Sequence, residues 1–414
     1  MAPRFVPAGP VEYHPWRPSG WGLLLIAAAL AGVLLGVALA NLWPRGPVGS
    51  SEYEIWRWEA RTLLDNAFAR LGIGPNPSED EGREALLEYF RLTSAIRAAA
   101  AAENPDLEAI SRLIDQRARF ENTVERLIER HIDEAVSAAG LERSLPLFDS
   151  VEIVWPPVDF ELTNPPQLLV ISPRSEIRRD RDILLENDLG LDEIQRLEAK
   201  TTDAEEVSVV VAIGGLAAYP AMVHSDRTYD STLNTAAHEW VHHYLAFYPL
   251  GEQWGKAGDA HTLNETTAEL AGEEIARLIR ERHPVEFPEG QDGRAPARPA
   301  PTLDFDKEMH ALRLEVDRLL AEGKVTEAEA LMERKRLELN AAGYNIRKIN
   351  QAYFAFHGTY AESPQSSDPI GPKVRQVWER TQDVGLFLVL MREVESAGEL
   401  DALLAELDGS VALP

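Results

Sequence analysis

Apolar residues recur at helical spacing toward both ends of the chain, and this pattern predicts two helical regions. The first covers residues 51–145, where the helix-forming run Ala98–Ala102 stops before Asn104-Pro105. The second covers residues 304–414, and Gly323-Lys324 breaks its first helix, so a helical hairpin is expected there.

A different pattern occupies the middle of the chain, residues 147–284. Short β-branched runs bounded by Pro or Gly predict strands, and segments with helical spacing follow them. Residues 216–223 are predicted to be one more strand, which Pro220 restricts to a sheet edge. The predicted fold class is therefore α+β, with a small mixed sheet, and the Pro-rich residues 285–303 are predicted to be a linker. The other predicted strands are 151–155, 167–173 and 207–215, and the predicted helices are 232–247 and 263–283.

The apolar run over residues 21–43 contains no charged residue and is long enough to cross a hydrocarbon core of about 30 Å as a helix. Trp21 and Trp43 bracket it, as interfacial anchors do. Positive charge is biased toward residues 1–20, which predicts a cytoplasmic tail, one transmembrane helix and an extracytoplasmic remainder. Two alternatives stay open: a cleaved signal peptide ending near Ala38-Leu39-Ala40, and a buried core helix.

Composition narrows both the partners and the chemistry. The chain has 41 Lys plus Arg and 68 Asp plus Glu, a net charge of −27, which works against nucleic acid as a partner. It has no cysteine, so a disulfide framework, a thiolate metal site and a cysteine nucleophile are all excluded. Any bound metal must be held by histidine and carboxylate side chains.

Three of the ten histidines lie within the stretch NTAAHEWVHH, residues 234–243. It contains the pattern HExxH, formed by His238, Glu239 and His242. Helical positions four apart lie about 40° apart around the axis, so the two histidines project from one face and can hold one ion. A catalytic zinc site needs a third protein ligand, which must come from another segment.

The stretch LNETTAELAG, residues 263–272, supplies that candidate. Together with HExxH it resembles the NE-x-x-x-[DE]-x-x-G element of thermolysin-like gluzincins, a group of zinc metallopeptidases that includes peptidase MA-like domains. The resemblance covers roughly residues 205–283. It implies a zincin-like catalytic domain, in which an active-site helix and a glutamate helix flank the metal beside the sheet.

The resemblance also implies a role for each matched residue. His238, His242 and Glu265 would bind Zn²⁺, and Glu239 would be the catalytic base toward a zinc-bound water. Glu269, one turn after Glu265, would accept a hydrogen bond from a ligand imidazole and orient it.

Two features of this stretch are less easily explained. Asn264 matches the motif, but the sequence alone reveals no chemical role for it. In addition, 22 residues separate His242 from Glu265, a few more than in those families. The connecting loop must therefore be longer or bulged.

Four further residues are candidates for substrate binding or for catalysis. Tyr219 and Ala221 lie on the presumed edge strand, where gluzincins hydrogen-bond an extended substrate, although ordinary packing would explain them equally. Peptide hydrolysis also needs a donor for the developing oxyanion. His357 and Tyr360 are candidates for this role, because they lie three positions apart in the stretch YFAFHGTY; a packed aromatic helix end is the alternative.

These observations predict a membrane-anchored zinc metallopeptidase of the bacterial envelope, which would hydrolyse a peptide or protein substrate. Whether it is an exopeptidase or an endopeptidase stays open. An intramembrane protease is disfavoured, because charged residues such as Asp230 and Glu252 flank the motif helix. The alternative is a tethered, non-catalytic scaffold of the envelope with a structural or vestigial metal site.

Overall fold

The computed structural model describes residues 48–59, 62, 77–145, 148–252, 259–295, 301–359, 363–367 and 369–411. The predicted tail, residues 1–20, and the predicted transmembrane helix, residues 21–43, lie outside these ranges. Within the part of the chain described, no helix is both long enough and apolar enough to cross a membrane. The fold is α+β, as predicted, and the described residues form two three-stranded sheets and one strand pair among many helices.

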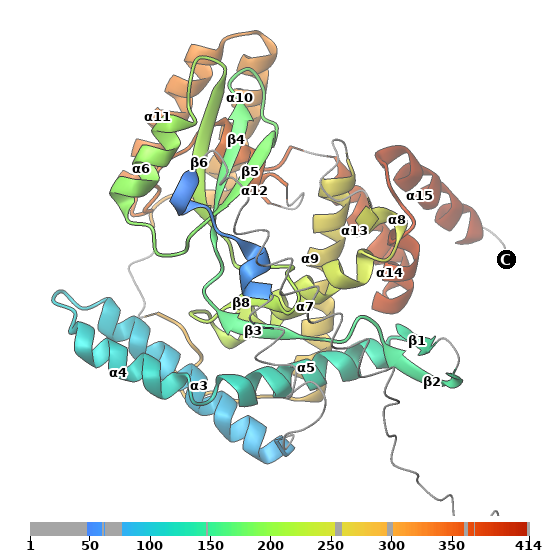
Figure 1. Cartoon of the computed structure of the whole chain (residues 1–414). Coiled ribbons are helices and arrows are strands. Elements are labelled where there is room, and N and C mark those ends of the chain that lie inside the picture. The colour runs from blue at the N-terminus through green and yellow to red at the C-terminus, as the bar shows by residue number, and fades with distance from the viewer. Residues whose placement is uncertain are drawn as a thin grey trace, which may run out of the picture.

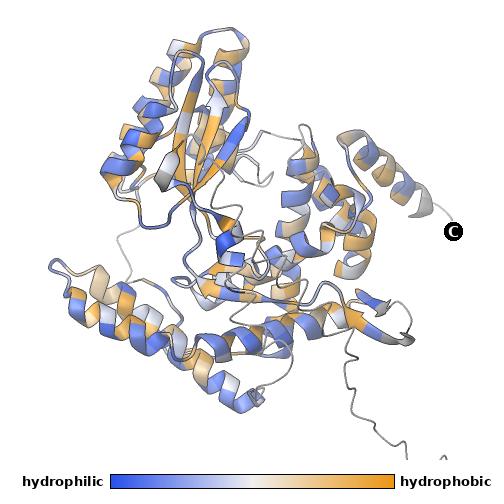
Figure 2. Ribbon diagram, in the orientation of Figure 1, coloured by the Kyte–Doolittle hydropathy of each residue, from blue (hydrophilic) through white to orange (hydrophobic). Residues whose placement is uncertain are grey.

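The molecule has two lobes, which we call the sheet lobe and the helical lobe (Figure 1). The sheet lobe is built on β4 (Gln167–Pro173), which pairs antiparallel with β5 (Arg181–Leu185) and with β6 (Glu206–Ala212). Side chains alternate across β4 because successive strand residues face opposite ways. Its two apolar faces pack against α6 (Leu191–Lys200) and α12 (Gln351–His357), and the strands are correspondingly apolar in Figure 2.

The helices of residues 304–414, predicted as one part, divide between the two lobes. The hairpin of α10 (Phe305–Ala321) and α11 (Val325–Ala341) shares a core with Phe354 of α12, in the sheet lobe. The last three helices instead join the core of the helical lobe; they are α13 (Ile370–Thr381), α14 (Val384–Met391) and α15 (Ala397–Val411).

The helical lobe contains the largest hydrophobic core. Its central pair is α7 (Tyr229–Leu245) and α9 (Ala260–Arg282), close to the predicted bounds of 232–247 and 263–283. The remaining elements of this lobe are α3 (Glu79–Ala100), α4 (Leu107–Arg117), α5 (Glu121–Ala138), α8 (Pro249–Glu252), the strand pair β1 (Glu142–Leu145) and β2 (Phe148–Val154), and the sheet of β3 (Phe160–Thr163), β8 (Ala221–His224) and β7 (Gly215–Leu216). A short 3-10 helix, Gly49–Ser51, precedes them in the chain.

The predicted edge strand over residues 216–223 is wrong. The segment forms two strands, and β8 lies in the centre of its sheet, parallel to β3 and antiparallel to β7. The backbone N–H of Ala221 donates a hydrogen bond to Asp159 O, so it is not free to bind a substrate. The edges of this sheet are β3 and β7, and β7 is only two residues long.

The predicted linker, residues 285–303, is packed along its first part. Phe287 makes edge-on ring contacts with Phe90 of α3, and Gly293 N–H donates to Ser94 Oγ of the same helix. Arg97 donates in turn to the carbonyl of Gly293. Residues 285–295 are therefore fixed to α3, rather than free between two domains.

Candidate metal centre

Helix α7 carries the HExxH residues and is anchored at both its start and its middle. Its N-cap is Thr228, whose side chain accepts a hydrogen bond from Ser231 N–H. Trp240 lies within the core, and its indole N–H donates to Pro156 O at 3.0 Å. These contacts fix the rotation of α7, so that His238 and His242 face α9.

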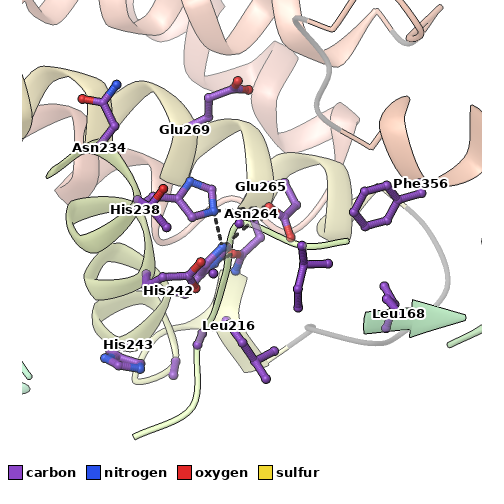
Figure 3. A pocket seen from close by; sticks show the side chains of 18 of the residues that line it. Leu168, Leu216, Asn234, His238, His242, His243, Asn264, Glu265, Glu269 and Phe356 are labelled. Atoms are coloured by element: carbon purple, nitrogen blue, oxygen red, sulfur yellow. Dashed lines mark hydrogen bonds and ion pairs between the residues drawn. The ribbon is translucent and has the colours of Figure 1, made fainter. Parts of the chain in front are cut away.

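The two imidazoles converge on one point together with Glu265 (Figure 3). The Nε2 atoms of His238 and His242 lie 2.9 Å apart. Glu265 Oε2 lies 3.5 Å from Nε2 of His238 and 3.6 Å from Nε2 of His242. Ligands of a tetrahedral zinc ion at 2.0–2.1 Å are about 3.3 Å apart, so these spacings suit such an ion. Glu265 Oε2 is buried without a hydrogen-bond partner in the described structure, which also fits a metal ligand.

Helix α9 reaches this position because it crosses α7 very closely at Gly272. A Cβ atom at this glycine would lie only 2.9 Å from His238 Cα and from its backbone nitrogen. The glycine at the end of the predicted motif is therefore a close-approach position between the two helices.

Asn264, for which the sequence suggested no role, contacts the second histidine. Its Oδ1 atom lies 2.7 Å from Nδ1 of His242 and accepts a hydrogen bond from it. A proton on Nδ1 leaves the lone pair of Nε2 for a metal. Sequence reasoning gave this orienting role to Glu269 instead.

The charges at the centre favour a cation. Burial alone would raise the pKa of Glu265, but His242 and His238 lower it well below its usual value. Burial disfavours charge on His238, yet its pairing with Glu265 and the nearby Glu239 raise its pKa to about 9. The negative charges that favour a proton on His238 would equally favour a divalent cation, and binding of the metal would displace that proton.

Glu239 lies beside the ligands and is covered by the edge strand β7. It is 6% exposed, and burial raises its pKa, although His238 and His242 oppose this. A Cβ atom at Gly215 would lie 2.3 Å from Glu239 Oε1, so the backbone of β7 passes directly over the carboxylate. Sequence reasoning missed Gly215; the Gly214-Gly215 pair at the end of a strand was the available signal.

These residues line a cavity of about 700 Å³ between the two lobes. The helical lobe supplies the ligands, Glu239 and the β7 segment 214–217. The sheet lobe supplies Leu168, Leu184 and Phe356, which form an apolar wall, and also Arg179. Glu269 and Glu273 of α9 line the acidic side.

Glu269 does not orient a ligand as predicted. Its carboxylate lines the cavity and points away from the two imidazoles (Figure 3). Its Oε2 atom is buried without a hydrogen-bond partner among the described residues, and burial raises its pKa.

Three other predicted residues, His357, Tyr219 and Ala221, lie outside the described lining of the cavity. His357, at the end of α12, packs its ring on Tyr353 at 4.3 Å, and burial lowers its pKa to about 4. The neighbouring Phe356 lines the cavity, whereas His357 is absent from the described lining. Tyr219 precedes β8 and packs against His243 at 5.4 Å, and Ala221 is buried within the sheet. Tyr360 lies outside the described residues.

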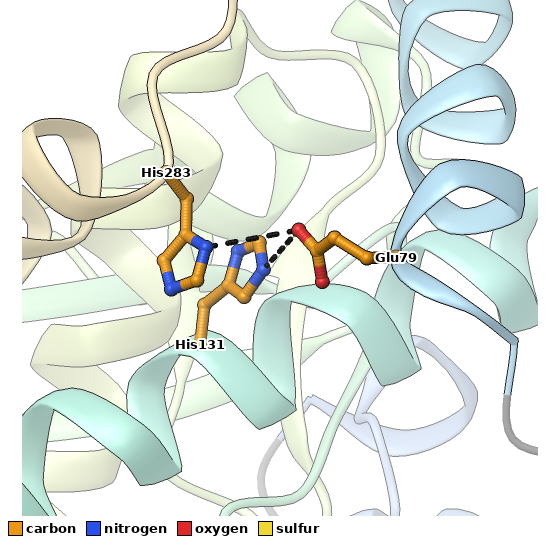
Figure 4. Close-up of side chains that lie close together, drawn as sticks. All are labelled: Glu79, His131 and His283. Carbon is orange, nitrogen blue, oxygen red and sulfur yellow. Dashed lines mark hydrogen bonds and ion pairs between the residues drawn. The ribbon is translucent and has the colours of Figure 1, made fainter.

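A second group of two histidines and a carboxylate joins α3, α5 and the end of α9 (Figure 4). The rings of His131 and His283 are stacked, with centroids 3.8 Å apart and planes 10° apart, and both face Glu79. Imidazole lone pairs lie in the ring plane, so two parallel rings cannot direct theirs to one ion. Arg130 already pairs with Glu79. By contrast, the planes of His238 and His242 are 85° apart, and the charged neighbours lining their cavity are mainly acidic. We therefore take only the first group as the candidate metal centre.

Comparisons with protein-family models, with curated proteins and with solved structures gave no match.

Proposed function

We propose that this protein is a zinc-dependent metallopeptidase of the gluzincin type. The observation that carries the proposal is the convergence of His238, His242 and Glu265 at one end of a cavity that also contains Glu239. Two neutral imidazoles and one carboxylate form the ligand set of catalytic zinc sites that keep an open position.

When bound there, zinc would supply Lewis-acid polarisation of a peptide carbonyl and of water. Glu239 would take the proton from the attacking water and deliver it to the leaving amine. Its burial supports this role, because a carboxylate with a raised pKa is a stronger base. Asn264 would keep His242 in the tautomer that presents Nε2.

The edge of β7 supports a peptide as the substrate. Within the described structure β7 pairs only with β8, and residues 214–217 line the cavity. An extended peptide could add to this edge through backbone hydrogen bonds, which would place a carbonyl group near Glu239. The edge position that sequence reasoning gave to Ala221 thus belongs to Gly215 and Leu216.

In this proposal residues 21–43 anchor the enzyme in the membrane, with the catalytic lobes outside the cytoplasm. A protease added to intact spheroplasts should then digest the C-terminal part. Protection of the whole chain in sealed cells, with digestion only after lysis, would contradict this orientation.

The central test is metal content and hydrolysis of a peptide library by the full chain in detergent. We expect about one zinc per chain in the wild type and in Glu239→Gln, and a sharp loss in Glu265→Ala. Hydrolysis should require both glutamates. His131→Gln is the matched control, because it removes an imidazole from the stacked histidine group and should leave the zinc content unchanged.

Absence of zinc from folded, zinc-replete protein would overturn the proposal. Bound zinc without hydrolysis of any peptide would favour the tethered scaffold instead.

A further inference from the structure

Arg179 lines the cavity from the sheet lobe. Among the described residues that line the cavity, Arg179 is the only Lys or Arg, whereas Glu239, Glu265, Glu269 and Glu273 are all acidic.

The guanidinium of Arg179 is held in place from both lobes. Its Nε donates to Asp182 Oδ2 at 2.5 Å in the sheet lobe, and its Nη1 lies 2.8 Å from Nε2 of His261, on α9. Arginine stays protonated and can only donate, so His261 Nε2 accepts and the imidazole is neutral. Burial, which lowers the pKa of His261 to about 4, agrees with this.

This arrangement leaves hydrogen-bond donors of Arg179 for another group. A guanidinium has five N–H donors, and the contacts described above use two of them. The Nη2 amino group makes no hydrogen bond to any residue in the described ranges. The side chain is 23% exposed, so the remaining donors are partly shielded from water, which strengthens a charge-assisted bond.

The position of Arg179 relates these donors to the candidate centre. His261 lies one helical turn before Glu265 on α9, so the partner of Arg179 and the third proposed ligand share a helix face. Beside Arg179 lies the apolar wall; its guanidinium carbon is 5.6 Å from the ring of Phe356, and Leu168 and Leu184 complete the wall.

We infer that Arg179 anchors a carboxylate of the peptide substrate, with an apolar side chain of that substrate packed against Phe356, Leu168 and Leu184. This inference rests on the proposed function, since it assigns a substrate class to the same cavity. The carboxylate is either a free C-terminus or an Asp or Glu side chain, because both present the same two oxygens to a guanidinium.

The test uses the full chain and four peptides that share one cleavable sequence. One peptide carries a free C-terminal carboxylate and no acidic side chain; one is its C-terminal amide. A third is the amide with an internal Glu, and the fourth is the amide with Gln at that position. We expect the wild type to prefer one carboxylate peptide over its neutral partner by about 10- to 100-fold in kcat/KM, the usual effect of a charge-assisted hydrogen bond. The preferred pair identifies the source of the carboxylate.

Variants of Arg179 separate anchoring from a purely structural link between the lobes. Arg179→Gln should abolish the preference, because KM should rise far more for the carboxylate peptide than for the neutral peptide. Arg179→Lys, which keeps the positive charge but loses the paired N–H donors of the guanidinium, should retain part of the preference. An equal loss for both peptides, or a wild type without any preference, would overturn the inference. If Arg179→Gln does not fold, the lysine variant and the wild-type preference still decide.

Binding to Glu239→Gln provides a readout that is independent of turnover. Fluorescence anisotropy with the same four labelled peptides should show the same carboxylate preference. Carboxylate-selective binding without hydrolysis by the wild type would count against the proposed function and in favour of the anchor. Hydrolysis without a preference for the carboxylate peptides would support the proposed function and count against the anchoring role of Arg179.

Discussion

Asn264 Oδ1 lies 2.7 Å from His242 Nδ1, on the opposite side of that imidazole from Glu265. Two consecutive residues of α9 thus contact both nitrogens of one histidine of α7. Asn264 accepts the hydrogen bond at Nδ1, while Glu265 faces Nε2. The Asn-Glu pair therefore has two linked roles at His242: Asn264 orients this proposed ligand, and Glu265 is a proposed ligand itself.

We expect Asn264→Ala to weaken zinc binding by about 10- to 100-fold while the protein stays folded, because partners that orient ligand histidines have effects of this size. Competition with a chromogenic chelator measures the affinity. Asn234→Ala is a matched control, since Asn234 lines the cavity but accepts its hydrogen bond from Arg280. Equal zinc affinity in the two variants would refute the orienting role of Asn264.

Gly215 and Gly214 should respond very differently to alanine. A methyl group at Gly215 would meet Glu239 Oε1 at 2.3 Å, so either the carboxylate or β7 must move. A misplacement of this size costs on the order of 100-fold in turnover. At Gly214 a methyl group would meet no described atom within 4 Å.

Steady-state kinetics and zinc content of both alanine variants provide the test. Turnover should fall only in Gly215→Ala, with zinc retained in both. Full activity of Gly215→Ala would mean that Glu239 does not need the position it has under β7.

The stacked pair of His131 and His283 should make stability depend on pH. Burial and the neighbouring His283 lower the pKa of His131, although Glu79 opposes them. The folded state therefore disfavours the protonated form. The stabilisation that neutral His131 contributes is complete above its pKa in the unfolded chain, about 6.5. It is lost as the pH falls through the lower pKa of His131 in the folded protein.

Urea unfolding at pH 7.5 and 5.5 checks this expectation. As the pH falls from 7.5 to 5.5, the wild type should lose more unfolding free energy than His131→Gln, because the variant has no titratable side chain at position 131. The neighbouring charges of Glu79, Glu134 and Arg130 are common to both proteins. An identical loss in the two proteins would show that His131 is not protonated on unfolding.

The helices around the candidate centre were predictable because their signals are local. Periodicity and helix-ending residues predicted α7 and α9 to within about three residues, and HExxH with Asn-Glu marked the side chains that the structure brings together. The binding of zinc there stays a prediction.

The contacts between distant segments were not predictable in this way. The parallel pairing of β3 with β8 joins residues about 60 positions apart, and it is this pairing that places Ala221 in the sheet centre. An apolar stripe shows that a helix is buried, but not against which partner, so the division of residues 304–414 between the lobes was missed. Arg179 and His261 meet across 82 positions, which no local pattern reveals.

The close crossing of α7 and α9 leads to a final prediction. The same change, glycine to alanine, should have opposite effects on stability at two helical glycines. At Gly272 a methyl group would press on the backbone of His238, at 2.9 Å from both Cα and N. Main-chain atoms yield less easily than a side-chain tip, so α9 must move away from α7. We expect Gly272→Ala to cost about 1–3 kcal/mol of unfolding free energy, as overpacking does.

At Gly409, in α15, a methyl group would meet no described atom within 4 Å. Gly409→Ala should therefore stabilise the protein by about 0.5–1 kcal/mol, because alanine restricts the unfolded chain and favours the helix. The zinc affinity of the two variants should differ as well. It should fall in Gly272→Ala, because moving α9 carries Glu265 away from the two histidines, and it should stay unchanged in Gly409→Ala. Stabilisation by both substitutions would show that the two helices do not require this close crossing.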